Sequence, residues 1–103
     1  MIDEILKATG LPFQETQFLR PPAGTYVVYM DDLTTDGPDK MNRIYLHNIT
    51  LEVYEPKPDK KAETAIESEL DKYGLHFIKQ ARYWIQTVQR YQVIYEFDYY
   101  TKK

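Results

Sequence analysis

Alternating residues near the C-terminus constrain the fold of this chain more than any other stretch. Across residues 91–100 the odd positions carry apolar and aromatic side chains, namely Tyr91, Val93, Tyr95, Phe97 and Tyr99. The even positions carry Gln92, Glu96 and Asp98, and only Ile94 breaks their polarity. A period of two is typical of a β-strand with one buried face. The stretch therefore predicts a long half-buried strand that other parts of the chain must cover.

Length and composition predict one globular domain. The chain has 103 residues, of which 43% are hydrophobic and 28% charged, with ten tyrosines and no cysteine. Domains most often contain about 100–150 residues, so we expect a single α+β domain over residues 1–103. The lack of cysteine excludes disulfides and thiolate metal sites. The net charge of −3 and the scattered basic residues argue against specific nucleic-acid binding.

Targeting signals are absent from the printed sequence. Its start, Met1–Glu4, lacks the basic region of a signal peptide. Its apolar runs all fall short of the ~20 residues that a membrane-spanning helix needs. We therefore expect a cytosolic protein without a membrane partner.

Two segments predict helices. In the first, Ile2, Ile5, Leu6 and Thr9 recur at helical spacing, and Gly10 suits a left-handed helix end. In the second, Asp59 is the expected N-cap and Gly74 the expected end. Its apolar face carries Ala62, Ile66, Leu70 and Tyr73. Its charged residues, Glu63, Glu67, Glu69, Asp71 and Lys72, are interpreted as a solvated face.

The remaining apolar runs predict strands. A weak extended segment covers residues 13–19, and residues 24–30 predict a strand that is buried on both faces or lies in the middle of a sheet. Residues 42–55 predict a longer strand whose apolar face switches near His47, which indicates a bulge there. Shorter extended runs cover residues 75–78 and 82–85.

The order of these elements favours one architecture. We expect an α+β fold in which a mostly antiparallel sheet of four to five strands packs one face against both helices. The other face would then be open, and it includes Ile94 and either Leu46 or Ile44 among polar residues. An open sheet face of this mixed kind is typical of a subunit interface.

A polar loop is expected over residues 31–41, with Gly37 and Pro38 as breakers. Its four aspartates do not match the spacing of an EF-hand, so we expect a solvated or partner-facing loop without metal. Together with the open sheet face, this loop supplies the candidate subunit or partner interface: Asp31, Asp32, Leu33, Asp36, Asp39, Met41, Ile94 and Glu96.

Motifs for catalysis or cofactor binding are missing from the sequence. Neither His47 nor His76 lies in a local pattern that would activate a serine or threonine. The four glycines have turn or cap explanations and do not form a phosphate-binding spacing. Glu96 and Asp98 lie side by side on one strand face, where carboxylates usually serve solubility. We therefore expect a protein that is not an enzyme and binds no cofactor.

Several stretches, taken together, resemble a known family. They are residues 5–12, the strand entry at 21–29, the residues 51–54 that lead into the acidic helix, and the closing residues 83–85 and 91–97. Over nearly its whole length the chain resembles the small tail-completion or tail-terminator proteins of long-tailed phages and prophages of Gram-positive bacteria. These proteins belong to the head–tail joining region.

The resemblance implies a structural protein that forms a ring, expected to be a hexamer, at the end of the tail tube. Its implied partners are the tail tube protein, the head connector protein and further copies of itself. Its implied location is the host bacterial cytoplasm during assembly and then the virion. The alternative is a cytosolic adaptor or inhibitor that binds other proteins through an exposed sheet face or edge.

Overall fold

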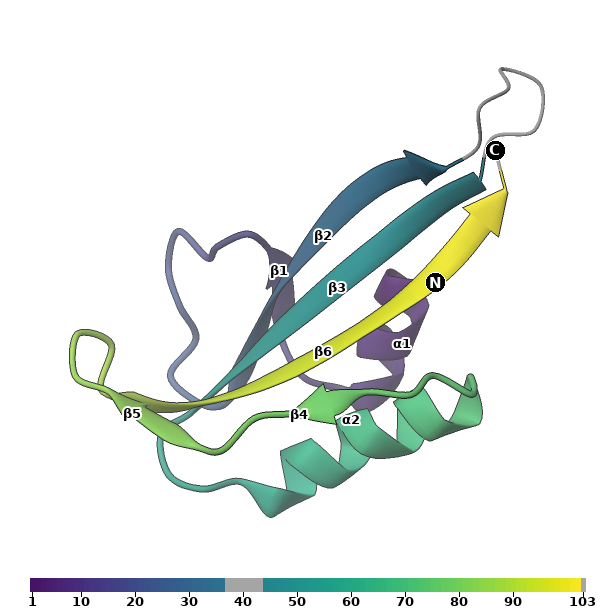
Figure 1. Ribbon diagram of the computed structural model, residues 1–103. Helices are drawn as coiled ribbons and strands as arrows, with labels where there is room; N and C mark the ends of the chain where they lie inside the picture. The colour runs from purple at the N-terminus through teal and green to yellow at the C-terminus, as the bar shows by residue number, and fades with distance from the viewer. Residues whose placement is uncertain (37–43, 103) are drawn as a thin grey trace.

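The computed structural model describes residues 1–36 and 44–102, which form one sheet with two helices on one of its faces (Figure 1). The helices are α1 (Ile2–Thr9) and α2 (Lys60–Lys72). The strands are β1 (Phe13–Glu15), β2 (Tyr26–Asp36), β3 (Ile44–Glu55), β4 (Ile78–Lys79), β5 (Tyr83–Ile85) and β6 (Arg90–Lys102). Neither helix in the described part of the chain is long and apolar enough to cross a membrane.

The sheet has six strands in the order β1-β2-β3-β6-β4, and β5 also pairs with β6. All ladders are antiparallel except that of β1, which runs parallel to β2. The α+β class and the placement of both helices on one face agree with the sequence prediction. The sheet is mixed, however, because the segment between β1 and β2 brings the chain back to the same end of the sheet before β2 begins (Figure 1).

The central ladders run without interruption along the whole of β3. β2 pairs with β3 from Tyr26↔Tyr54 to Asp36↔Ile44, and β3 pairs with β6 from Ile44↔Lys102 to Glu55↔Tyr91. The predicted bulge near His47 is therefore wrong. The apparent switch has another cause, because this regular strand carries apolar side chains on both faces: Ile49, Leu51 and Val53 lie on the helix-covered face, whereas Ile44 and Leu46 lie on the opposite face, where Ile44 is exposed.

Odd-numbered residues of the three central strands build the core beneath the helices. The core combines Ile2, Ile5, Leu6, Ile66 and Leu70 from the helices with Val27, Tyr29, Ile49, Leu51, Val53, Val93, Tyr95, Phe97 and Tyr99 from the sheet. This confirms the prediction that the alternating C-terminal strand has a buried odd face. Tyr26 and Val28 are also buried. β2 is therefore covered on both faces at its start, as predicted.

Local signals set the ends of both helices. Gly10 follows α1 with φ of 76°, and Gly74 follows α2 with φ of 70°; glycine adopts this left-handed region without a steric penalty. Asp59 caps the start of α2, because its Oδ1 accepts a hydrogen bond of 3.0 Å from the Ala62 N–H. Its Oδ2 accepts a second one of 2.6 Å from the Thr25 hydroxyl. Asp59 thus ties α2 to the segment that enters β2.

The Asp59→Ala variant is expected to be less stable than the parent by about 1–2 kcal/mol, because it loses the helix cap and the Thr25 hydrogen bond. For a domain of this size that loss lowers the melting temperature by roughly 4–15 °C. Thermal denaturation followed by circular dichroism measures it. Asp71→Ala is the matched control, since Asp71 is exposed in the last turn of α2. Equal melting temperatures for the two variants would contradict the assigned role.

Candidate functional site

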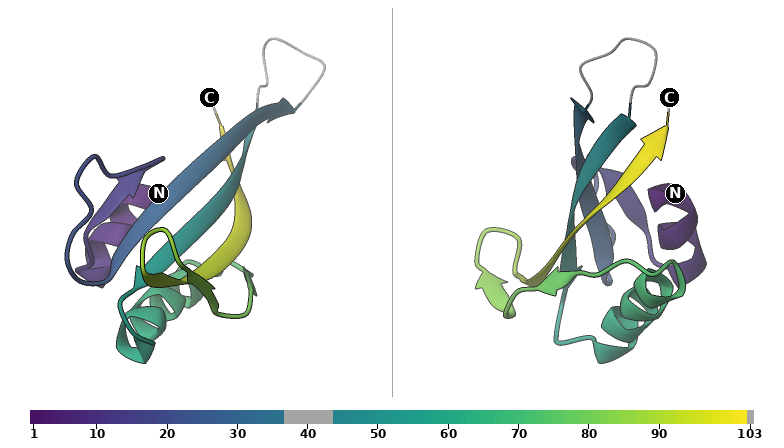
Figure 2. Two further views of the ribbon diagram at one scale, coloured as in Figure 1. Left: turned by 90° about the vertical axis from the view of Figure 1, so that its left-hand side faces the viewer. Right: turned by 45° about the vertical axis from the view of Figure 1, so that its right-hand side comes forward.

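A three-stranded ribbon begins at the edge of the helix-covered core and continues beyond it, and it is here called the arm. It consists of residues 31–36 of β2, 44–49 of β3 and 97–102 of β6, which are paired row by row. Figures 1 and 2 show this end of the sheet extending beyond both helices. The molecule is elongated accordingly, with extents of 47 × 27 × 23 Å. The arm is the part of the sheet that the chain's own helices leave least covered.

One side of the arm ends in an open edge on β6. The Gln80 N–H donates a hydrogen bond of 2.9 Å to the Ile94 carbonyl, so even-numbered β6 residues turn their backbone groups toward β4. The pairing with β4 ends at Glu96. Beyond it Asp98, Tyr100 and Lys102 direct their N–H and C=O groups to an edge that no described strand occupies. This stretch is called the β6 edge.

The opposite side of the arm ends in a second open edge, on β2. The Thr16 N–H donates a hydrogen bond of 2.8 Å to the Tyr29 carbonyl, so odd-numbered β2 residues face β1. The β1 ladder ends there. Asp31, Leu33 and Thr35 therefore direct their backbone groups away from the sheet, where residues 1–36 and 44–102 supply no pairing strand. This stretch is called the β2 edge.

Side-chain hydrogen bonds hold the three strands of the arm together on the sheet face that also carries the helices. His47 of β3 lies between Asp31 and Thr101: its Nδ1 is 2.8 Å from Asp31 Oδ2, and its Nε2 is 2.8 Å from Thr101 Oγ1. The imidazole also stacks on the Tyr99 ring, with centroids 4.6 Å apart. Both ring nitrogens of His47 are thus engaged by neighbouring strands. These hydrogen bonds link side chains of β2, β3 and β6, which favours a rigid arm.

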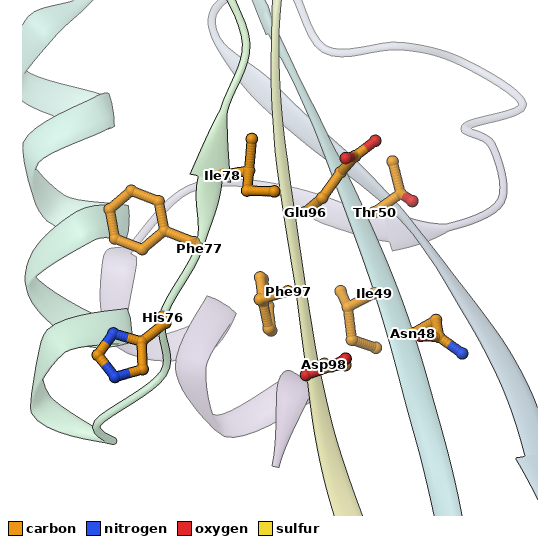
Figure 3. Close-up of a pocket in the computed structure, with 9 residues that line it drawn as sticks. All are labelled: Asn48, Ile49, Thr50, His76, Phe77, Ile78, Glu96, Phe97 and Asp98. Atoms are coloured by element: carbon orange, nitrogen blue, oxygen red, sulfur yellow. The ribbon is translucent and has the colours of Figure 1, made fainter.

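The opposite face of the arm and sheet mixes apolar and acidic side chains. Ile94 is half-buried, whereas Glu96 is exposed and accepts a hydrogen bond of 3.0 Å from the Gln80 side chain. A shallow cleft of about 470 Å³ opens where β4 stops along β6 (Figure 3). Its lining residues are Asn48, Ile49, Thr50, His76, Phe77, Ile78, Glu96, Phe97 and Asp98. The cleft marks the start of the β6 edge.

The predicted loop over residues 31–41 is wrong for residues 31–36, which form a strand. Asp31, Asp32, Leu33 and Asp36 belong to β2, because each pairs with a residue of β3. Local composition suggested a loop, but the partner strand extends far enough to keep these residues in the ladder. Asp39 and Met41 lie outside the described residues. Of the predicted interface, the structure thus places four residues on the outer strand of the arm and two, Ile94 and Glu96, on β6 beside it.

A buried cluster of charges, which the sequence did not reveal, joins the body of the protein to β4 and β5. Glu55 at the end of β3 is 0% exposed, and Glu63 of α2 is 4% exposed. Arg82 donates hydrogen bonds to both carboxylates, at 3.3 Å to Glu55 and 2.6 Å to Glu63. The Lys79 Nζ lies 2.9 Å from Glu63 Oε1 and 2.8 Å from Glu67 Oε2. The interpretation of Glu63 as part of a solvated face is therefore wrong.

The reason lies in the chain segment that follows α2. Lys79 belongs to β4 and Arg82 lies between β4 and β5, and both side chains reach back to α2, where they cover Glu63 in its first turn. Glu67 also accepts a hydrogen bond of 2.6 Å from the buried Tyr95 hydroxyl. Every acid of this cluster therefore has a cationic or hydroxyl donor. We interpret the cluster as a set of ion pairs and hydrogen bonds that stabilises the packing of α2 against the sheet.

Protonation of the cluster is expected to make stability depend on pH. Burial and the adjacent Glu63 carboxyl raise the pKa of Glu55 to about 7 from its ordinary 4.5. The folded state thus holds a proton that the unfolded state has lost between these pH values, so stability falls as pH rises from about 4.5 through 7. The pKa of Glu63 is lowered to about 2 by its bonds to Glu55, Lys79 and Arg82, despite its burial. The stability that Glu63 contributes is fully present above about pH 4.5 and is lost as the pH falls from there through about 2.

Melting temperatures measured between pH 5 and 8 test this expectation. The parent protein should lose on the order of 2 kcal/mol of stability over that range. Glu55→Gln should show a flatter profile, because its side chain does not titrate. Glu96→Gln serves as the control, since Glu96 is exposed and outside the cluster. A parent profile parallel to that of Glu55→Gln would contradict the role of Glu55.

Comparisons with known proteins place the fold. No protein-family model matches the chain. No curated protein sequence matches it either. Among solved structures, a chain of the virion of a native gene transfer agent particle is similar, with a TM-score of 0.64 and 17% sequence identity. The alignment covers 96% of this chain and 84% of that one. The two chains therefore share the α+β fold over nearly their full lengths.

Proposed function

We propose that this protein is a structural component of a phage or phage-related virion, and that it acts without catalysis. In this proposal it completes the tail by forming a ring at the end of the tail tube and joins it to the head connector. The fold it shares with a chain of the gene transfer agent virion supports the virion assignment. The sequence resemblance to tail-completion and tail-terminator proteins supports the more specific role.

The observation that carries the proposal is the arm with its two open edges. An exposed strand edge is a template for pairing with another chain, and proteins that act alone usually shorten, cover or distort such edges. Here the edges lie on opposite sides of one rigid ribbon, at Asp31–Asp36 and Phe97–Lys102. A surface with two different contact sites on one subunit suits assembly into a ring, in which each copy contacts two neighbours.

Charge on the arm also fits a ring through which DNA passes. Asp31, Asp32, Asp36 and Asp98 contribute acidic groups to its strands, and the whole chain carries a net charge of −3. A bore lined by negative charge repels DNA phosphates and so lets DNA slide without sticking. The proposal therefore places the arm around the bore, with the helices on the outside.

Native mass spectrometry and negative-stain electron microscopy of the purified protein, with and without purified tail tubes, test the proposal. The expected result is a ring, or protein bound at the ends of tubes and not along their sides. A monomer that ignores tube ends and instead binds a soluble cellular protein would contradict the proposal. That outcome would favour the alternative of a cytosolic adaptor that pairs through an open strand edge.

A further inference from the structure

We propose that the β6 edge of one copy pairs directly with the β2 edge of the next copy, in parallel orientation, so that the arms form one continuous sheet around the ring. This inference rests on the proposed function, which states that the copies form a ring but does not say which surfaces of neighbouring copies meet. It names the partner of each edge as a second copy of this chain. It also predicts which backbone groups meet: those of Asp98, Tyr100 and Lys102 with those of Asp31, Leu33 and Thr35.

The directions of the two edge strands favour parallel pairing between copies. β2 and β6 are both antiparallel to β3, so they run in the same direction toward the tip of the arm. Rotation about an axis that lies along the arm leaves strand direction unchanged. A neighbour generated by such a rotation therefore brings its β2 edge parallel to the β6 edge. A two-fold dimer would instead join two like edges in antiparallel orientation and leave the other edges open.

The two edges also match in length and in position along the arm. The arm has six residues on each outer strand, 31–36 and 97–102, and they occupy the same six rows of the ladder. Both edges thus begin and end at the same height on the arm. A parallel neighbour can match one edge to the other over its full length without a step. Repeated around a closed ring, this pairing leaves no open edge on the arm.

Two features that would prevent pairing, proline and bulges, are missing from the described strands of the arm. Neither 31–36 nor 97–102 contains a proline, and the arm ladders of the described chain run without a bulge. Proline and bulges are two of the usual protections of an exposed edge. Each edge also carries one large exposed apolar side chain, Leu33 at 52% and Tyr100 at 62%. Pairing between copies would cover both of these side chains.

Disulfide trapping tests the contact, because the chain has no native cysteine. Thr34, Asp98, Tyr100 and Lys102 are even-numbered and share one face of the sheet. Thr34→Cys is combined in turn with Asp98→Cys, Tyr100→Cys or Lys102→Cys, which samples three registers. Disulfides form when the two Cα atoms lie about 4.4–6.8 Å apart. Oxidation under ring-forming conditions, with tail tubes where they are needed, is followed by non-reducing gel electrophoresis.

The expected result is a ladder of covalent oligomers larger than dimers for at least one double variant, with no more than trace dimer for each single variant. Efficient dimers from a single variant would show that like edges meet, which overturns the proposal. Rings visible by microscopy without a ladder from any double variant would also overturn it while leaving the proposed function intact. If the parent protein forms neither rings nor complexes at tube ends, the proposed function itself fails.

Discussion

The Arg82→Ala variant is expected to melt at least about 10 °C below the parent protein. Arg82 is the cation that reaches both buried acids, Glu55 at 3.3 Å and Glu63 at 2.6 Å. Removal of one partner from a buried ion pair costs about 3–5 kcal/mol, because the remaining charge stays desolvated and unpaired. The Arg82 side chain is 30% exposed, so we expect a loss near the lower value, about 3 kcal/mol.

Chemical denaturation at pH 8, above the pKa of about 7 of Glu55, measures this loss as a free energy of unfolding. Arg20→Ala is the matched control, since Arg20 is exposed on the segment between β1 and β2, and it should change stability by less than about 0.5 kcal/mol. Addition of Glu55→Gln to Arg82→Ala should restore part of the stability, because a neutral amide needs no counter-ion. Additive effects of the two substitutions would show that Glu55 and Arg82 act independently and would contradict the cluster.

The Leu33→Pro variant is expected to remain folded as a monomer and to lose ring assembly. The backbone N–H of Leu33 points away from β3, so proline there removes no hydrogen bond within the subunit. It does remove a donor from the β2 edge and places a proline ring against the incoming strand. We expect at least roughly tenfold weaker association at each contact, equivalent to about 1.4 kcal/mol.

Thr34→Pro is the control that separates assembly from folding. Its N–H points toward β3 by the alternation of the strand, so proline at this position breaks an internal ladder bond and should lower the melting temperature. Sedimentation velocity and binding to tube ends measure assembly, and circular dichroism measures folding. Normal rings from Leu33→Pro would rule out pairing through the β2 edge.

Several features of the fold followed from short stretches of sequence. The alternation from Tyr91 to Tyr99 predicted the buried face of β6, and the residues around Asp59 and Gly74 predicted both ends of α2. These predictions succeeded because periodicity, capping and left-handed glycine conformations depend on neighbours within a few residues. Ile94 and Glu96 were likewise placed correctly on the outer face of the last strand by the period of two.

The candidate site was less accessible to sequence reasoning. Residues 31–36 have a loop-like composition, yet they form a strand because β3 lies beside them along their full length. Nothing local distinguishes Glu63 from the exposed acids of α2, and its burial arises from Lys79 and Arg82, which follow it by 16 and 19 residues. The parallel pairing of β1 was missed for the same reason, since it depends on the path of a connecting segment.

The sequence by itself determined that this chain has two short helices and a tyrosine-rich sheet with one apolar face, since each depends on the order of neighbouring side chains. Only the tertiary structure decided how far the helices cover that sheet. Eight and thirteen helical residues cannot span strands of eleven to thirteen residues in full, because a helix rises about 1.5 Å per residue and a strand about 3.3 Å. The strand length that the helices leave uncovered makes up most of the arm, and the arm provides the two edges proposed to join neighbouring copies.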